Sequence, residues 1–236
     1  MNYGFVGLGN LGAKLVANLL RGGVSVKVFD LNQEAVEKAK ALGADAARSV
    51  AAAASDVDGL ITCLPSPVAS EAVVSGPDGA FAHMKPGATW IEMSTLGVDD
   101  IKRLAAQAAE QGLKTLETPL TGGVHRAVTG DMTILAGGAE DTLIAHRPAL
   151  EIMSGKIVHM GPIGSASLIK VISNMLCLID LVAAGEALSL AKAGGLDLGK
   201  AYEAITASSG NSQEFEDWAP VILNGSLNTG FTLDLG

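Results

Sequence analysis

Lys170 and Asn174 stand in an apolar stretch at a spacing that could support acid–base chemistry. They are four residues apart, so on a helix they share one face. Burying an unpaired ammonium group is costly, which indicates a specific role for a lysine in so apolar a setting. Two readings stay open from this stretch alone. Either Lys170 transfers a proton with Asn174 beside it, or its amine extends to solvent while Asn174 caps a neighbouring loop.

A long helix must carry this pair. Turn residues at Gly161-Pro162-Ile163-Gly164-Ser165 precede it, and Gly194-Gly195 follow the apolar pattern that runs through to Ala193. At 1.5 Å per residue such a helix would be about 40 Å long. That length suffices to run between two domains.

A second group of functional residues lies near the amino end. The short apolar strand predicted at Tyr3 to Val6 leads into Gly7-Leu8-Gly9-Asn10-Leu11-Gly12, and a helical pattern follows to Leu20. In such a turn the first glycine allows the tight bend, the second lets the backbone approach a pyrophosphate, and the third lets the helix pack against the strand. The helix amino terminus supplies N–H donors for the phosphates.

An acid follows at the distance that this turn requires. The next predicted strand, Val24 to Phe29, ends at Asp30, 18 residues after Gly12 (30 − 12). A carboxylate there can accept hydrogen bonds from both ribose hydroxyls and repels a 2′-phosphate, which favours NAD over NADP. A strand, a glycine turn, a helix, a second strand and an acid follow one another in this order, which predicts a dinucleotide-binding site. The alternative is a glycine turn that serves only the packing of the helix on the strand.

Two later strand ends also offer ligand contacts. The strand predicted at Asp58 to Leu64 ends in Pro65-Ser66-Pro67, and two prolines end a parallel ladder and fix a loop. The strand predicted at Ala88 to Met93 ends at Ser94-Thr95. Ligands lie at this edge of doubly wound sheets. The hydroxyls of Ser94 and Thr95 would suit a ribose or nicotinamide edge, and they would equally suit capping of the helix predicted from Val98 or Asp99.

A third strand end carries adjacent glycines. The segment Thr118-Pro119-Leu120-Thr121-Gly122-Gly123 follows a strand predicted at Leu113 to Glu117. Exposed N–H groups of Gly122 and Gly123, with the hydroxyl of Thr121, would form a nest for a carboxylate. Taken alone, a plain turn explains the segment as well.

Composition limits the classes of partner. The 236 residues are 48% hydrophobic, enough for a sizeable core, and the net charge is −9. Since no long Lys/Arg cluster occurs, we expect neither nucleic-acid nor anionic-membrane binding. We also expect no membrane span, because no uncharged apolar run reaches about 18 residues.

The cysteines and histidines indicate the cellular compartment and whether a metal site is expected. Cys63 and Cys177 sit inside apolar runs and cannot form a disulfide framework, and the amino end reads as a strand rather than a signal peptide, so we expect a reducing cytoplasm. His125, His146 and His159 show no metal-ligand spacing, and we interpret them as structural or surface residues.

Strand and helix patterns alternate through most of the chain. This rhythm predicts an α/β domain over residues 1–162 with a Rossmann-type, doubly wound, mostly parallel sheet. Residues 163–236 are then predicted to hold the long helix and an all-helical second domain.

Together these motifs resemble the β-hydroxyacid dehydrogenase family, of the 3-hydroxyisobutyrate dehydrogenase type. Gly7 to Gly12 is similar to its cofactor signature. Residues 118–123 are similar to its substrate segment Asp-Ala-Pro-Val-Ser-Gly-Gly, with Glu117 and Thr118 in place of the Asp and Ala and Thr121 in place of the serine. Residues 161–174 are similar to its catalytic segment Gly-x-x-Gly-x-Gly-x-x-x-Lys-x-x-x-Asn, with Ala166 where the third glycine is usual.

The resemblance implies an activity and roles. It implies NAD-dependent oxidation of a small 3-hydroxy acid to the semialdehyde, or the reverse reduction, in a homodimer or homotetramer. Lys170 would be the general acid–base with Asn174 beside it. The implied binding residues are Thr121, Gly122 and Gly123 for substrate, and Leu64, Pro65 and Thr95, with the glycine turn, for cofactor. Relatives continue past Phe231–Gly236 into a Lys-Asp pair and further helices, so we expect the second domain to be truncated here.

Three alternatives stay open. An imine reductase of this architecture would carry a different residue at the position of Lys170, and a decarboxylating dehydrogenase of phosphorylated sugar acids would need an arginine cluster. The third is a non-catalytic NAD-binding scaffold, which the Lys170–Asn174 pair disfavours.

Overall fold

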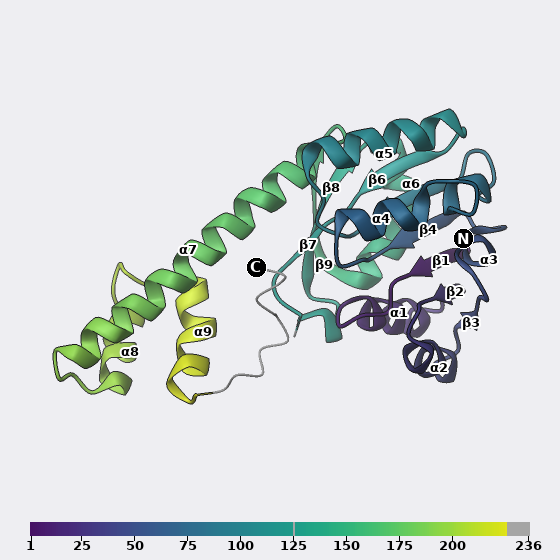
Figure 1. The fold of residues 1–236 in the computed structure, drawn as a ribbon. Coiled ribbons are helices and arrows are strands. Elements are labelled where there is room, and N and C mark those ends of the chain that lie inside the picture. Colours follow the sequence, from purple (N-terminus) through teal and green to yellow (C-terminus); the bar gives the residue numbers. More distant parts are fainter. Residues whose placement is uncertain (125, 226–236) are drawn as a thin grey trace. The chain divides into compact units, whose positions relative to one another are not determined.

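The computed structural model describes residues 1–124 and 126–225 (Figure 1). It separates into two compact units that meet between Val171 and Ile172, inside the long helix.

One sheet organises the first unit. Among the described residues it has nine strands: β1 Tyr3–Val6, β2 Val26–Phe29, β3 Asp45–Ala46, β4 Gly59–Thr62, β5 Thr89–Glu92, β6 Lys114–Glu117, β7 Leu120–Thr121, β8 Met132–Gly138 and β9 Ser154–Gly161.

The strand order is β3-β2-β1-β4-β5-β6-β8-β7, and β9 pairs with β8. Pairing is parallel from β3 through to β6, and β8 joins β6 antiparallel. The order reverses direction between β1 and β4, which is the topological switch point where such sheets bind ligands. The predicted doubly wound, mostly parallel sheet is therefore confirmed.

Helices cover both faces of this sheet (Figure 1). One face packs against α1 Gly12–Arg21, α2 Gln33–Ala41 and α6 Glu140–Met153. The other face packs against α3 Val50–Ala54, α4 Pro67–Val74 and α5 Val98–Glu110. Successive strand residues alternate between the two cores, so Trp90 lies in one and Ile91 in the other, both fully buried. Strands buried on both faces explain the continuous apolar runs of the sequence.

Side-chain caps begin several of these helices. Asn32 Oδ1 accepts hydrogen bonds from the N–H groups of Glu34 and Ala35 at 3.0 and 3.4 Å, so Asn32 caps α2. Ser66 caps α4 ahead of Pro67, whose ring suits the first turn of a helix.

Some short elements and one strand pairing in the structure were not predicted from the sequence. The two-residue strands β3 and β7 were not predicted, since two residues carry no periodicity. The pairing of β9 with β8, which starts at Ser154 and Met132 and continues through two register shifts, was not predicted either. Two 3-10 turns, at Ala80–Ala82 and Arg126–Val128, were also not predicted.

The described part of the second unit is helical. It holds the end of α7 Ser165–Ala193, then α8 Leu198–Thr206 and α9 Gln213–Leu223. Its small core contains Ala184, Leu188, Phe215 and Ala219. The expectation about the segment Phe231–Gly236 lies outside the described residues.

Helix α7 is long and apolar. By length and composition it could cross a membrane, with a mean hydropathy of 1.8 over its most apolar stretch, although core helices of soluble proteins meet the same criterion. The sequence prediction counted only uncharged runs, and Asp180 and Glu186 interrupt this one. Its exposed apolar side chains are Leu168, Val171, Ile172, Met175, Leu176, Ile179, Val182 and Leu190.

Candidate functional site

The sheet register aligns the carboxyl ends of five strands. Phe29, Val6, Thr62, Glu92 and Glu117 form one row across β2, β1, β4, β5 and β6. The residues that follow them in the chain therefore share one edge of the sheet. Every strand-end motif selected from the sequence starts at this edge.

The turn after β1 has space only for glycine at two positions. Gly7 has φ +102°, and a Cβ there would lie 2.2 Å from the carbonyl oxygen of Cys63. A Cβ on Gly12 would lie 1.9 Å from the carbonyl oxygen of Gly7. Gly9 differs, since a Cβ would meet no described atom within 4 Å and the residue is exposed. Gly7 and Gly12 thus shape the turn, whereas Gly9 leaves open space beside it.

The same turn presents N–H donors. Within residues 1–124 and 126–225, no acceptor engages the amides of Gly9, Leu11 and Gly12. Leu11, the N-cap of α1, makes no side-chain capping bond. Donors without an acceptor at a helix amino terminus suit a phosphate group.

Asp30 is attached to this turn. Its Oδ2 accepts a hydrogen bond from the N–H of Leu8 at 2.5 Å, and its Oδ1 accepts one from the N–H of Asn32 at 2.7 Å. Each carboxylate oxygen keeps a further lone pair for a hydroxyl donor. Open space at Gly9, donors on the turn and this carboxylate together fit a dinucleotide. The Leu8 contact could not be read from the sequence, because it joins residues 22 apart.

The loops after β4 and β5 are linked by a serine. Ser94 Oγ accepts a hydrogen bond from the N–H of Leu64 at 2.8 Å and lies 3.3 Å from Ser70 Oγ. Pro65 and Thr95 are exposed beside this link. Gly97 rather than Thr95 is the N-cap of α5, and no side chain caps that helix, so the capping interpretation of Thr95 is wrong.

Glu92 lies buried beneath these loops. It is 1% exposed, and its Oε1 accepts a hydrogen bond from the N–H of Ser94 at 2.7 Å. Its Oε2 has no hydrogen-bond partner among the described residues. Burial raises the pKa of Glu92 to about 7, although the hydrogen bond from Ser94 acts in the opposite direction. Sequence reasoning missed this residue because an acid inside a strand carries no motif.

Thr121, Gly122 and Gly123 form a turn after β7. Thr121 pairs with Thr133 of β8, and both glycines have positive φ, +115° and +78°. The two glycines are exposed. Their placement leaves open the predicted role in holding a carboxylate.

Lys170 lies in the second turn of α7 and is half-buried, as is Asn174 one turn later. Lys170 belongs to the first unit and Asn174 to the second. The first turn of this helix is bound to the sheet edge by Glu117, whose carboxylate accepts hydrogen bonds from Gly164, Ala166 and Ser167. The sequence placed Glu117 in the segment similar to the substrate segment of the family, but it did not reveal this contact with the helix, because the partners are 47 to 50 residues away.

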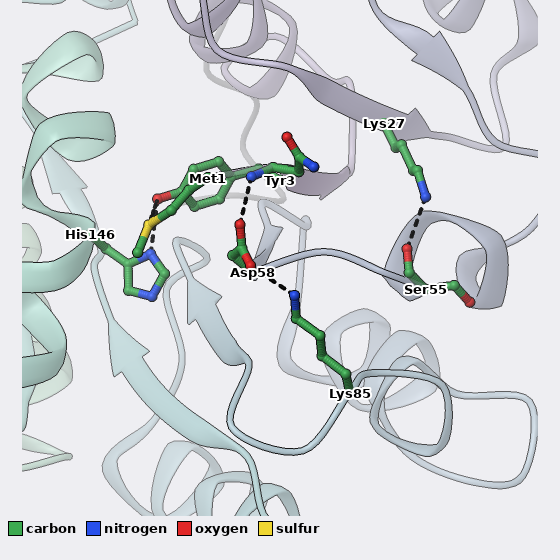
Figure 2. Close-up of polar contacts among 8 residues, drawn as sticks. Met1, Tyr3, Lys27, Ser55, Asp58, Lys85 and His146 are labelled. Atoms are coloured by element: carbon green, nitrogen blue, oxygen red, sulfur yellow. Dashed lines mark hydrogen bonds and ion pairs between the residues drawn. The ribbon is translucent and has the colours of Figure 1, made fainter.

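The opposite edge of the sheet holds a separate polar cluster (Figure 2). The hydroxyl of Tyr3 and Nδ1 of His146 are 2.9 Å apart, while Asp58 accepts hydrogen bonds from the N–H of Asn2 and from Lys85. Burial lowers the pKa of His146 to about 4, so its ring is neutral at pH 7. Burial, with a smaller effect of Asp58, raises the pKa of Tyr3 to about 12. This cluster contains structural residues rather than proton-transfer groups at neutral pH.

No group of three His, Cys, Asp or Glu side chains within the described ranges could hold a metal ion. His159 Nε2 lies 2.9 Å from the carbonyl oxygen of Gly138. His125 lies outside the described residues.

Comparison with known proteins identifies the family. Residues 2–161 match the model for the NAD-binding domain of 6-phosphogluconate dehydrogenase, and residues 164–236 match the model for the NAD-binding region of NADP-dependent 3-hydroxyisobutyrate dehydrogenase. The chain belongs to the β-hydroxyacid dehydrogenase family. It is accordingly a nicotinamide-dependent hydroxyacid dehydrogenase by class.

Relatives of this β-hydroxyacid dehydrogenase have several named substrates. It is 37% identical to the NAD-dependent L-serine dehydrogenase of Pseudomonas aeruginosa, over 92% of this chain and 72% of the relative. It is 33% identical to the L-threonate dehydrogenase of Cupriavidus necator, over 99% and 79%. A solved structure of Mycobacterium tuberculosis 3-hydroxyisobutyrate dehydrogenase with L-serine superposes with a TM-score of 0.85 at 34% identity, over 93% of this chain and 75% of that one.

Proposed function

We propose that this chain oxidises the hydroxyl of a small 3-hydroxy acid of the 3-hydroxyisobutyrate type to the semialdehyde, or catalyses the reverse reduction, with NAD. The observation that carries the proposal is the half-buried Lys170 in the second turn of α7, within the same compact unit as the glycine turn. The relatives named for serine, threonate and 3-hydroxyisobutyrate support the substrate class.

The cofactor-binding residues follow from the turn. The amides of Gly9, Leu11 and Gly12 would bind the pyrophosphate, and Asp30 would accept hydrogen bonds from ribose hydroxyls. Leu8, Asn10, Leu64, Pro65 and Thr95 would complete the contacts. When bound, the dinucleotide supplies the hydride acceptor.

Asp30 supports NAD rather than NADP. Its carboxylate would repel a 2′-phosphate, and the next side chain, Leu31, is 89% exposed and uncharged. An NADP site would place a cation at such a position to pair with the phosphate.

The chain's own part in the reaction is binding and proton transfer. Thr121, Gly122 and Gly123 would hold the substrate carboxylate through a hydroxyl and backbone N–H groups. Lys170 Nζ would accept the hydroxyl proton during oxidation and return it to the carbonyl oxygen during reduction. The O–H bond thus breaks toward Lys170 while the C–H bond gives up its hydride. Asn174 would orient the amine or the substrate without changing the charge.

Assembly and compartment belong to the same proposal. The exposed apolar face of α7 favours a homodimer or homotetramer, in which a second copy would cover it. Two free cysteines favour a reducing cytoplasm. Sedimentation of the purified chain tests the oligomer.

A substrate panel tests the activity. The protein would be mixed with NAD or NADP and with 3-hydroxyisobutyrate, L-serine, L-threonate or the 2-hydroxy acid lactate, and the absorbance of the reduced cofactor would be followed. The proposal expects turnover of at least one 3-hydroxy acid with NAD and none of lactate. NAD binding by dialysis without turnover of any acid would instead favour a cofactor-binding scaffold.

A further inference from the structure

Glu117 makes four hydrogen bonds to the beginning of α7. Its Oε1 accepts from the N–H groups of Gly164 at 2.6 Å and Ala166 at 3.0 Å. Its Oε2 accepts from the N–H of Ser167 at 3.0 Å and from the Ser167 hydroxyl at 2.5 Å. The side chain is 1% exposed, so these bonds form away from solvent. Both carboxylate oxygens are thus committed to one helix turn.

The surrounding backbone leaves room for this carboxylate. A Cβ on Gly137 of β8, the register partner of Glu117, would lie 2.2 Å from Glu117 Oε1. Gly164 donates its N–H from a backbone with φ +99°, a conformation that side-chain-bearing residues rarely adopt. Glycines therefore occur on both sides of the contact, where any other residue would displace it.

The charge of Glu117 matches its position. The first N–H groups of a helix have no partner inside the helix, and the helix dipole places partial positive charge there. A carboxylate satisfies both, and hydrogen bonds to an ionised acceptor are stronger than neutral ones. An uncharged amide at residue 117 would place an NH₂ group toward N–H donors and lose part of the contact.

Two chain segments with proposed roles start from this contact. Thr121 follows Glu117 by four residues along the strand end, and Lys170 follows Ser167 by three residues along the helix. The peptide N–H of Thr118 also donates to the carbonyl oxygen of Glu92 at 2.7 Å, which fixes the start of the first segment on the sheet. Movement of the helix turn away from Glu117 would shift Lys170 relative to the Thr121 turn.

We propose that Glu117 is a positioning residue that sets the location of Lys170 relative to the substrate-holding turn by binding the first turn of α7. Its carboxylate is bound by residues 164–167, so it would act through the helix rather than on the substrate or the cofactor. The inference rests on the proposed function, since it assigns Lys170 the proton transfer. Its consequence is a kinetic effect on turnover that is separate from cofactor binding.

Three variants test this role against wild type. Glu117→Gln keeps the size and removes the charge, Glu117→Asp keeps the charge and shortens the side chain, and Ser167→Ala removes only the hydroxyl bond. Ser49→Ala is the matched control, because it removes a serine bond at the start of α3, 3.1 Å from the Ala52 N–H, without touching α7. For each, kcat and KM for the 3-hydroxy acid would be measured per cofactor site, counted by titration of NADH fluorescence.

The expected result is a fall in kcat with little change in cofactor affinity. Since misplacement by about 1 Å can cost about 100-fold, we expect a kcat loss of about 10- to 100-fold in Glu117→Gln and a smaller loss in Ser167→Ala. Glu117→Asp should recover part of the loss, the cofactor Kd should stay within about twofold, and Ser49→Ala should keep wild-type kcat. Because kcat is expressed per cofactor-binding site, a variant that is only partly folded does not give a falsely low kcat.

Wild-type kcat in Ser167→Ala and in a folded Glu117→Gln would overturn the role of Glu117. If Glu117→Gln does not fold, wild-type kcat in Ser167→Ala overturns it alone. These outcomes are distinct from failure of the proposed function, which would be wild-type turnover in Lys170→Ala or no turnover in the wild-type protein. Equal loss of kcat in Glu117→Asp and Glu117→Gln would also contradict the role of the charge.

Discussion

Glu92 and Glu117 are register partners at the ends of β5 and β6, and their buried carboxylates are hydrogen-bonded in different ways. Glu117 has both oxygens bound by the start of α7. Glu92 binds the N–H of Ser94 through one oxygen, and its other oxygen has no partner within the described ranges. Neighbouring acids of equal burial thus differ because only one lies under a helix amino terminus.

The burial of Glu92 predicts that the free energy of unfolding depends on pH. Its pKa is raised from 4.5 to about 7 by burial, so between these values the native state holds a proton that the unfolded chain has released. The free energy of unfolding therefore falls as pH rises through this window, by on the order of 3 kcal/mol in total. Glu92→Gln should remove this fall.

Urea unfolding of the cofactor-free protein measures the effect. The stability of Glu92→Gln relative to wild type should increase steadily from pH 4.5 to pH 7. His146 acts in the opposite direction, because its pKa of about 4 makes stability rise with pH up to about 6.5. The variant should therefore show a rise in stability with pH without the opposing fall from Glu92. A stability difference that is the same at pH 4.5 and pH 7 would show that Glu92 does not titrate in the window.

Two glycines of the first turn should respond differently to the same change. Gly9→Ala places a methyl group in open space, so the melting temperature should stay at the wild-type value while cofactor binding weakens about tenfold or more. Gly12→Ala forces a Cβ to within 1.9 Å of the Gly7 carbonyl oxygen, so it should destabilise the fold by about 1–3 kcal/mol.

Thermal unfolding and NADH titration distinguish the two variants. Unchanged cofactor affinity in Gly9→Ala would mean that no ligand approaches the turn there. A Gly12→Ala protein as stable as wild type would contradict the close packing of α1 on β1.

Asp30 should set the choice of cofactor. Asp30→Asn keeps an acceptor for the Leu8 N–H but removes the negative charge that would repel a 2′-phosphate. We expect the ratio of NADP to NAD affinity to rise about tenfold, equivalent to about 1.4 kcal/mol. Asp45→Asn, at an exposed position on β3, is the control that removes one charge elsewhere. An unchanged ratio in Asp30→Asn would show that another residue selects the cofactor.

Much of the fold follows from local sequence patterns. The strand, glycine turn and acid around Gly7 and Asp30 predicted the first βαβ unit, because each part has a short-range requirement that the sequence displays. Long-range contacts were not predictable in this way. The bond from Leu8 to Asp30 and the bonds from α7 to Glu117 join residues that neither periodicity nor spacing relates.

The residues of the candidate site also fall into two groups, those that local sequence patterns indicate and those that depend on long-range contacts. The segment with Lys170, which we propose to be catalytic, and the glycine turns could be selected because their residue types are unusual in their setting. The buried position of Glu92, the bond from Leu64 to Ser94 and the helix contacts of Glu117 could not be predicted, since an acid or serine at a strand end has several ordinary explanations. Their importance depends on burial and on partners in other elements.

Lys170→Ala tests the central claim, that Lys170 transfers the proton. Positioned acid–base catalysis contributes about 10²–10⁴-fold, so kcat for the 3-hydroxy acid should fall by that factor while the NADH dissociation constant stays at the wild-type value. Lys192→Ala is the control, because Lys192 is an exposed lysine in the last turn of the same helix and should keep full activity. The measurement is kcat per NADH-binding site for the three proteins. A large loss confined to Lys170→Ala is the predicted result, and wild-type turnover in that variant would contradict the account.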